Sequence, residues 1–544
     1  MSMTPGSPAD GPEYLDGSGP AQTAPDNDNK KRLIAVGAIV AGGAVVAGGA
    51  WAATSFFSTG AQPAEALPAS TVAYFSVDLD PSGGQKIEAI KTLRKFPGFT
   101  DKVDLQTDDD LRERFFEEVT SSGECEGLDY DADVKPWLGS RAAMAVVDLG
   151  EDEPTPVGVV QTTDGGKAED GLSTLVDACG GGEGAEGDVG GWVVDGDWIV
   201  VAETPEIAQQ VVDAADGSTL AGDASFEEWT GEAGDDGFMS MYVSRAAADL
   251  MADQPGLFDG LAEGQREFQS SGGLPGAEEA QEFRELLKDF DGAAATVRFD
   301  DGAVEIEYAM SNYQPDMTKF IDSETGADMV AGLPDDTVAA FGMSLEEGWA
   351  GAMLDYVKLT LPEDSETIDE QLAQLESETG LAFPEDIETL LGEGLTVSMG
   401  SGLDPDAVAN GGPGEVPVGI RIDGDADEIQ AVLDKIAAQA GPEMAEFMQV
   451  TEGDGYAVLA LQEGYRGDLE GGGGLGDSAA YSEVVSDEAQ SVLFVNFNAD
   501  DDWLVRLTGD SPEVSDNLEP LSAFGVSGWV DDEVVHGLVK VTTD

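Results

Sequence analysis

Hydrophobic and polar residues alternate along the chain in two ways, which predict strands interspersed with helices. The segments TVAYFSVDL, RAAMAVVDL and TPVGVVQTT are short and rich in β-branched residues, as strands are. The segment GWVVDGDWIVVAE contains the tight turn Asp195–Gly196 and predicts a hairpin. EIAQQVVDAA and ADEIQAVLDKIAAQ have apolar residues at helical spacing. Because many strands are joined by short turns, we expect an α+β fold with a mostly antiparallel sheet.

A different pattern, an uncharged and apolar stretch, runs from Leu33 to Phe57. Since roughly 20 apolar helical residues cross a membrane core, 33–57 is predicted to be a transmembrane helix. A cleaved signal peptide ending near 50–52 is the alternative, but the apolar run continues beyond that point.

Basic residues around this stretch predict its orientation. Lys30, Lys31 and Arg32 precede it directly, and no further Lys or Arg occurs before Lys86. This asymmetry predicts a single-pass membrane protein with a cytoplasmic tail at 1–32 and an extracellular C-terminal region. The many Pro, Gly, Ser and Asp residues of the tail predict that it is disordered.

The net charge of the chain limits the kinds of molecule that it can bind. The chain has 25 Lys and Arg against 110 Asp and Glu, which gives a formal net charge of −85. Such a chain repels polyanions, so nucleic-acid binding is excluded. Since 41% of the residues are hydrophobic, we expect a folded acidic protein and not a disordered one. An ion-rich exterior would screen the self-repulsion.

The chain also contains an internal repeat. Five short segments of the first half recur in the same order in the second half. They are Leu67–Phe75 with Leu333–Phe341, Leu138–Gly139 with Leu391–Gly392, Pro156–Val159 with Pro417–Ile420, the segment ending at Phe226 with that ending at Tyr481, and Phe299–Asp301 with Val530–Asp532.

The repeat predicts the domain organisation. After a linker at 58–65 we expect a first α+β repeat at 66–311, a connector at 312–331 and a second α+β repeat at 332–544. The first repeat has a helical insertion at about 249–293. One helix of the insertion has an apolar stripe that faces either the core or a partner. Its members are Ala280, Phe283, Leu286, Leu287 and Phe290.

Several of these segments are similar to a known family. The opening LPASTVAYF after an apolar stretch, the segment IEAIKTLRKFPGF and the strand WLGSRAAMAVV resemble the actinobacterial family designated domain of unknown function 3352. The resemblance covers most of the region after the apolar stretch. It implies a membrane-anchored, non-cytoplasmic protein, and it implies no activity and no site residues.

Residues with distinctive chemistry are few. Cys125 and Cys179 are the only cysteines, and outside the cytoplasm we expect them to form a disulfide, with two buried thiols as the alternative. The single histidine, His536, is predicted to lie in a strand, and one histidine excludes multi-histidine zinc sites. No catalytic residue, cofactor or metal ligand is predicted; calcium binding on the acidic surface has no predicted position. Asp423, Asp425 and Asp427 begin like a calcium loop, but they are better read as a helix cap.

One short helix departs from the general acidity. Lys86, Lys91, Arg94 and Lys95 lie close together, with Ile87 and Ile90 between them. They form either a solvated helix face or a contact with anionic lipid headgroups or wall polymers.

These observations favour a non-catalytic envelope protein that binds a ligand or a partner protein. A duplicated sheet could enclose an apolar groove for lipid-like molecules between its halves. The alternatives are a carboxylate-based envelope hydrolase and a structural or stress-related acidic surface protein.

Overall fold

The computed structural model describes most of the chain after residue 61. The described residues are 62–544 without 80–83, 101–105, 107–108, 121–126, 152, 180–189, 254–286, 301, 315–317, 361–364, 405–406, 409, 411, 441–444, 446, 454, 500–502, 504–511 and 532. The predicted transmembrane helix and its basic flank, Lys30, Lys31 and Arg32, lie outside the described residues. Among the described residues, no helix combines the length and the apolar character needed to cross a membrane.

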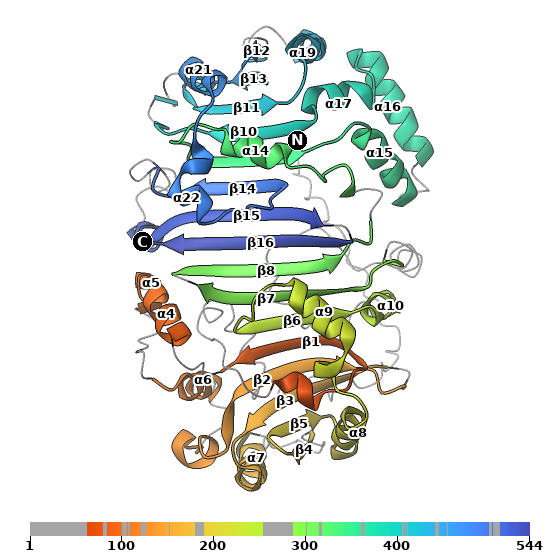
Figure 1. The fold of residues 1–544 in the computed structure, drawn as a ribbon, viewed down its shortest axis with the longest axis vertical. Helices are drawn as coiled ribbons and strands as arrows, with labels where there is room; N and C mark the ends of the chain where they lie inside the picture. Colours follow the sequence, from red (N-terminus) through yellow and green to blue (C-terminus); the bar gives the residue numbers. More distant parts are fainter. Residues whose placement is uncertain are drawn as a thin grey trace, which may run out of the picture.

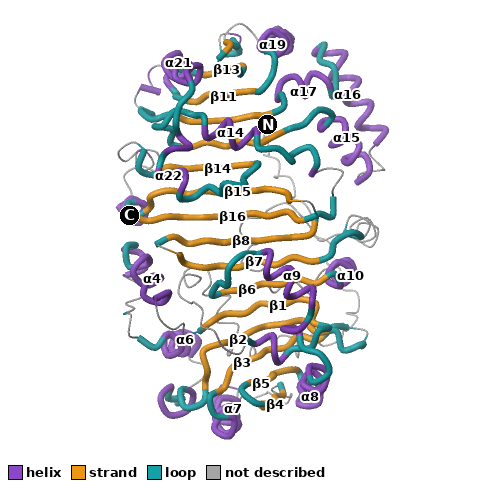
Figure 2. The backbone as a smooth tube through the Cα atoms, in the orientation of Figure 1, coloured by secondary structure: helices purple, strands orange, loops and turns teal. Residues whose placement is uncertain are grey.

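The secondary structure follows the predicted periodicities, and the mostly antiparallel α+β fold is confirmed (Figure 2). In the first half the strands are β1 (Thr71–Asp78), β2 (Leu138–Val147), β3 (Thr155–Thr162), β4 (Gly191–Asp195), β5 (Trp198–Ala202), β6 (Met239–Ser244), β7 (Gly292–Asp300) and β8 (Ala303–Ser311). In the second half they are β9 (Ala339–Ser344), β10 (Gly394–Met399), β11 (Val418–Ile422), β12 (Thr451–Glu452), β13 (Ala457–Ala460), β14 (Ser491–Asn496), β15 (Leu521–Asp531) and β16 (Val534–Thr543). The predicted β4–β5 hairpin turns at Gly196, whose φ of 58° suits glycine.

All sixteen strands form one sheet, in which every pairing is antiparallel (Figure 1). Its order is β12-β13-β11-β10-β9-β14-β15-β16-β8-β7-β6-β1-β2-β3-β5-β4. Outward from the middle, the first half reads β8-β7-β6-β1-β2-β3-β5-β4 and the second reads β16-β15-β14-β9-β10-β11-β13-β12. The two halves therefore have the same strand order and meet edge to edge, where β8 pairs with β16 from Ser311–Val534 to Ala303–Thr542.

The strand registers of the two halves also correspond. Phe75 pairs with Met144 in the first half, and Phe341 pairs with Val397 in the second, at offsets of 266 and 253 residues that agree with the sequence matches. The match at Pro156 is displaced by one residue. Pro156 pairs with Val146, and the equivalent partner of Met399 is Val418, not Pro417. A one-residue slip exchanges the faces of a strand, so sequence similarity alone misaligned this strand.

Local contacts repeat with these registers. The Thr71 hydroxyl donates a hydrogen bond to the Pro68 carbonyl at 2.7 Å, and Thr337 does the same to Pro334 at 2.7 Å. The rings of Phe226 and Tyr242 lie 5.1 Å apart. The rings of Tyr481 and Phe494, in the corresponding place, lie 5.3 Å apart.

Helices cover both faces of the sheet. On one face, cores form beneath η2 (Pro63–Ala66), α8 (Pro205–Ala215), α9 (Ala224–Glu232), α14 (Thr325–Ala331), α21 (Glu463–Gly471) and α22 (Ala479–Ser482). In Figure 1, α9 and α14 lie in front of the sheet. On the other face, cores form beneath α4 (Gly84–Leu93), α7 (Gly165–Cys179), α17 (Glu385–Leu391) and α19 (Ala426–Ala440).

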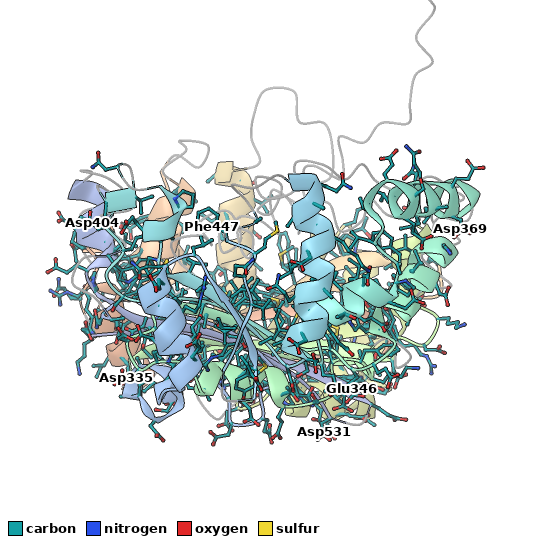
Figure 3. The ribbon with its side chains drawn as sticks, turned by 90° about the horizontal axis from the view of Figure 1, so that it is seen from above. Asp335, Glu346, Asp369, Asp404, Phe447 and Asp531 are labelled. Carbon is teal, nitrogen blue, oxygen red and sulfur yellow. The ribbon has the colours of Figure 1, made fainter. Side chains whose placement is uncertain are left out.

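The remaining α-helices lie around these layers. They are α5 (Pro97–Thr100), α6 (Leu111–Thr120), α10 (Ala246–Asp253), α15 (Trp349–Thr360), α16 (Ser365–Thr379) and α24 (Pro512–Leu518). Figure 3 shows the molecule from above, with acidic side chains at its outside. Those labelled are Asp335, Glu346, Asp369, Asp404 and Asp531, and all five are exposed.

Candidate apolar binding face

The middle of the sheet has one face without charged side chains. Successive residues of a strand point to opposite faces, so the register places Phe75, Met241, Ile306, Leu493 and Phe341 on the same side. We call this side of the sheet the apolar face. It extends over nine adjacent strands, in the order β10-β9-β14-β15-β16-β8-β7-β6-β1. On these strands it contains no Asp, Glu, Lys or Arg, and the few polar residues between its apolar ones include Thr71, Tyr308, Ser491 and Thr543.

A row of directly paired residues crosses the apolar face. The pairs connect six adjacent strands from β8 to β10, which at about 4.8 Å per spacing extend over about 24 Å. In order, the row is Ile306, Val539, Val526, Leu493, Phe341 and Val397. Four of them, and Met241 nearby, are between 37 and 40% exposed. Most large apolar side chains of a sheet are buried, so this row is an unusual surface.

The opposite side of the same strands is buried, and polar side chains lie there among the apolar core residues. Thr296, Glu305, Ser344, Thr396, Ser398, Asn496, Ser527 and His536 are all at most 8% exposed. Surrounding elements hydrogen-bond to several of them. The Tyr465 hydroxyl donates to Ser398 at 2.9 Å, and the Gly326 amide donates to the Ser344 hydroxyl at 2.9 Å. Partners of this kind offset the cost of burying polar groups.

Where the halves meet, the buried polar side contains a charged network. Glu305 accepts from Arg298 Nε at 2.7 Å and pairs with Lys540 Nζ at 2.6 Å, and Arg298 also reaches Glu307. Burial lowers the pKa of the Arg298 guanidinium, but the carboxylates of Glu307 and Glu305 outweigh this effect and raise it. Because β8 and β16 belong to different halves, the Glu305–Lys540 pair joins the two halves.

His536 lies in β16, as predicted, beside this network. Its ring is stacked on Trp529 at 5.1 Å and 6°. At the observed offset of 231 residues, Trp529 and His536 occupy the places that Arg298 and Glu305 have in the first half. An aromatic pair therefore replaces an ion pair.

The four predicted basic residues lie on and just after α4. Lys86 Nζ donates to the Asp109 carbonyl at 2.6 Å, and Lys95 Nζ donates to the Thr543 hydroxyl at 2.8 Å. Both lysines thus contribute to the fold. Lys91 and Arg94 are exposed, and Arg94 Nη1 is 3.4 Å from the Gln106 side-chain oxygen.

The other predicted residues are distributed as follows. Cys125 lies outside the described residues, so the disulfide stays a prediction. Asp425 accepts hydrogen bonds from the amides of Asp427 and Glu428, each at 3.0 Å, which confirms the helix-cap reading. Of the predicted apolar stripe, Leu287 and Phe290 are buried against Ala248, whereas Ala280, Phe283 and Leu286 lie outside the described residues.

Two further observations bear on chemistry. Within the described part of the chain, no three His, Cys, Asp or Glu side chains gather so that they could hold a metal ion. Glu305 and Glu307 are near each other but are paired with cations, an arrangement unlike the two opposed acids of a glycosidase.

The sequence reasoning missed the apolar face. It considered a groove that the two halves could enclose, whereas the described residues of the two halves meet through the ladder of β8 and β16. The available signal was the alternation in AVEIEYAMS, where Ile306 and Tyr308 alternate with Glu305 and Glu307. That alternation shows that the strand has two different faces. It does not reveal which face helices cover.

Comparison with known proteins identifies the family and goes no further. No curated protein and no solved structure matches the chain. The family described as "Protein of unknown function (DUF3352)" matches residues 33–441, three quarters of the sequence. The chain therefore belongs to the DUF3352 family.

Proposed function

We propose that this chain is a membrane-anchored extracytoplasmic protein that binds apolar or amphiphilic molecules on the apolar face without catalysing a reaction. The observation that carries the proposal is the exposed row from Ile306 to Val397. Large exposed apolar surfaces on soluble regions commonly mark interaction sites. In a chain with 110 acidic residues, the open part of this face, six strands from β8 to β10 without charge, indicates a requirement other than solubility.

The length of the row suits an alkyl chain. A membrane core is about 30 Å thick, so one acyl chain extends over about 15 Å. The row, about 24 Å across six strands, can accept such a chain along its whole length. Covering its side chains contributes about 25 cal/mol per Å² of apolar area removed from water.

The proposal includes the origin of this surface. We infer that the two halves are copies of one unit, which is supported by their common strand order and by the repeated Thr71 and Thr337 hydrogen bonds. Pairing of β8 with β16 joins two half-faces into one continuous face.

The anchor and the orientation belong to the same proposal. Residues 33–57 would span the membrane, and Lys30, Lys31 and Arg32 would remain in the cytoplasm. The apolar face would then lie outside the cell, where lipids and other amphiphiles leave and enter the membrane.

Binding of Nile red, an uncharged apolar dye, tests the binding function. We expect the full-length protein, kept in solution by an amphipathic polymer that does not bind the dye, to bind Nile red. Leu493→Asp should weaken that binding at least about fivefold, because a ligand would have to desolvate the new carboxylate. Leu375→Asp on α16 is the matched control, since Leu375 is 44% exposed and lies off the row.

The outcomes separate clearly. Weakened binding by Leu493→Asp with unchanged binding by Leu375→Asp supports the proposal. Absence of dye binding, or equal effects of the two substitutions, contradicts it. Both variants should retain the unfolding midpoint of the parent, because both positions are exposed.

A further inference from the structure

The helix α4 borders the apolar face and has an unusual charge. The segment from Gly84 to Lys95 contains four cations and one acid, Glu88, in a chain of net charge −85. Two of the cations, Lys86 and Lys95, are used in the hydrogen bonds described above. Lys91 and Arg94 are exposed, and Arg94 also donates to the Gln106 side chain.

The position of α4 places these cations at one end of the exposed row. Ala89 of α4 belongs to the buried cluster that contains Val297 and Phe299 of β7. Val297 is the direct cross-strand partner of Ile306, where the exposed row begins. In this line of paired residues, Val297 of β7 is therefore buried beside α4, whereas Ile306 of β8, the next residue, is exposed to solvent.

The cations also have an apolar neighbour on their own helix. Ile87, Lys91 and Arg94 are spaced by four and three residues, so they share one side of α4. Ile87 is 41% exposed. This side of α4 combines an apolar contact with two positive charges.

The corresponding helix of the second half provides an internal comparison. At the β1–β9 offset of 266, α4 corresponds to α15, and Ile87 corresponds to Met353, which is 43% exposed. Lys91 and Arg94 correspond to Val357 and Thr360. The apolar position is kept in both halves, whereas the two exposed cations occur at one end only.

We infer that the ligand of the apolar face is an anionic amphiphile, with its headgroup on Lys91 and Arg94 and its alkyl chain along the row toward the second half. This inference rests on the proposed function. An ammonium and a guanidinium together suit a phosphate or carboxylate headgroup. The apolar row suits the chain, and the difference between α4 and α15 fixes its direction.

The test compares two single-chain amphiphiles with the same alkyl chain. Dodecyl phosphate and dodecyl maltoside are titrated below their micelle concentrations into the full-length protein, and displacement of Nile red is measured. For the double variant K91Q/R94Q we expect a loss of about tenfold in affinity for dodecyl phosphate. The affinity for dodecyl maltoside should change less than about twofold.

A matched control removes two cations elsewhere. K135Q/K167Q produces the same change in net charge at two exposed lysines that lie on neither α4 nor the row, and it should leave both affinities unchanged. Equal losses in the two double variants would show a general charge effect and overturn the inference. Unchanged dodecyl phosphate binding in K91Q/R94Q would overturn it as well.

Two further outcomes distinguish this inference from the proposed function. If dodecyl maltoside binds but dodecyl phosphate binds no more tightly, only the headgroup assignment fails. If neither binds, the proposed function fails. Inorganic phosphate alone should displace no Nile red at the concentrations used, and displacement by it would assign the cations to a free anion.

Discussion

The two faces of β8 differ from the usual arrangement, in which charged side chains are exposed and aliphatic side chains are buried. Glu305 and Ile306 are neighbours in β8, yet the carboxylate is buried and the aliphatic side chain is 39% exposed. The buried side is stabilised by its apolar cores, by the pairing of its charges and by hydrogen bonds to hydroxyls such as that of Ser344. On the exposed apolar side, no contacts of this kind within the described residues account for the exposed side chains of the row, and the proposed ligand would account for them.

The largest predicted effect removes the charge pairing of the buried side. Glu305→Ala leaves Arg298 and Lys540 without their shared carboxylate, and we expect it to lower the free energy of unfolding by about 3 kcal/mol. Ile306→Thr, the adjacent residue on the exposed side, should cost less than about 1 kcal/mol. Urea denaturation of both variants measures the difference. Similar costs would show that the two faces do not differ in the way described.

An ion pair on the apolar-face side provides a second, smaller effect that depends on pH. Lys435 Nζ lies 2.6 Å from Asp386 and joins α19 to α17. Burial opposes ionisation of Asp386, but hydrogen bonds from Lys435 and the Ala382 amide outweigh it, so the pKa of Asp386 lies below its ordinary value. A lowered folded-state pKa stabilises the protein above the unfolded pKa of about 3.9, and this stabilisation is lost as the pH falls through the folded value.

We therefore expect Asp386→Asn to cost about 1 kcal/mol at pH 6 and progressively less below about pH 4. Urea denaturation at a series of pH values measures this. Asp369→Asn is the control, because the Asp369–Lys358 pair is more exposed and should contribute less than about 0.5 kcal/mol. A cost for Asp386→Asn that rises on acidification would contradict the assignment.

The smallest effect concerns the exposed side itself. A methylene group contributes about 0.8 kcal/mol when fully buried, and a chain on an open sheet is about half covered. Extending an alkyl maltoside from ten to twelve carbons should thus tighten binding about fourfold. Titration of the two ligands measures this, and no dependence on chain length would show that the alkyl chain does not contact the row.

The local sequence predicted many of the strands and helices of this fold, but it did not predict which distant strands pair with each other. Apolar periodicity located β1, β2, β3, the β4–β5 hairpin, α8 and α19, because each depends on its own side chains. The pairing of β8 with β16 joins residues more than 200 positions apart, and neither strand alone specifies its partner. The slipped match at Pro156 has the same cause, because the strand ladder and not the local sequence sets the register.

The candidate site divides in the same way. Lys91 and Arg94 could be found in the sequence because a basic segment is conspicuous in an acidic chain. Ile306, Leu493, Phe341 and Val397 could not, since each resembles an ordinary core residue of a strand. Their exposure results from which helices cover which face, and that depends on the whole fold.

Photolabelling with an alkyl phosphate whose chain bears a diazirine tests the central claim most directly. After irradiation with the full-length protein, peptides are analysed by mass spectrometry. We predict labelling concentrated in β8, β14, β9 and β10, at or beside Ile306, Leu493, Phe341 and Val397, and its loss on competition with dodecyl phosphate. Labelling spread over the surface, or concentrated away from these strands, would contradict the account.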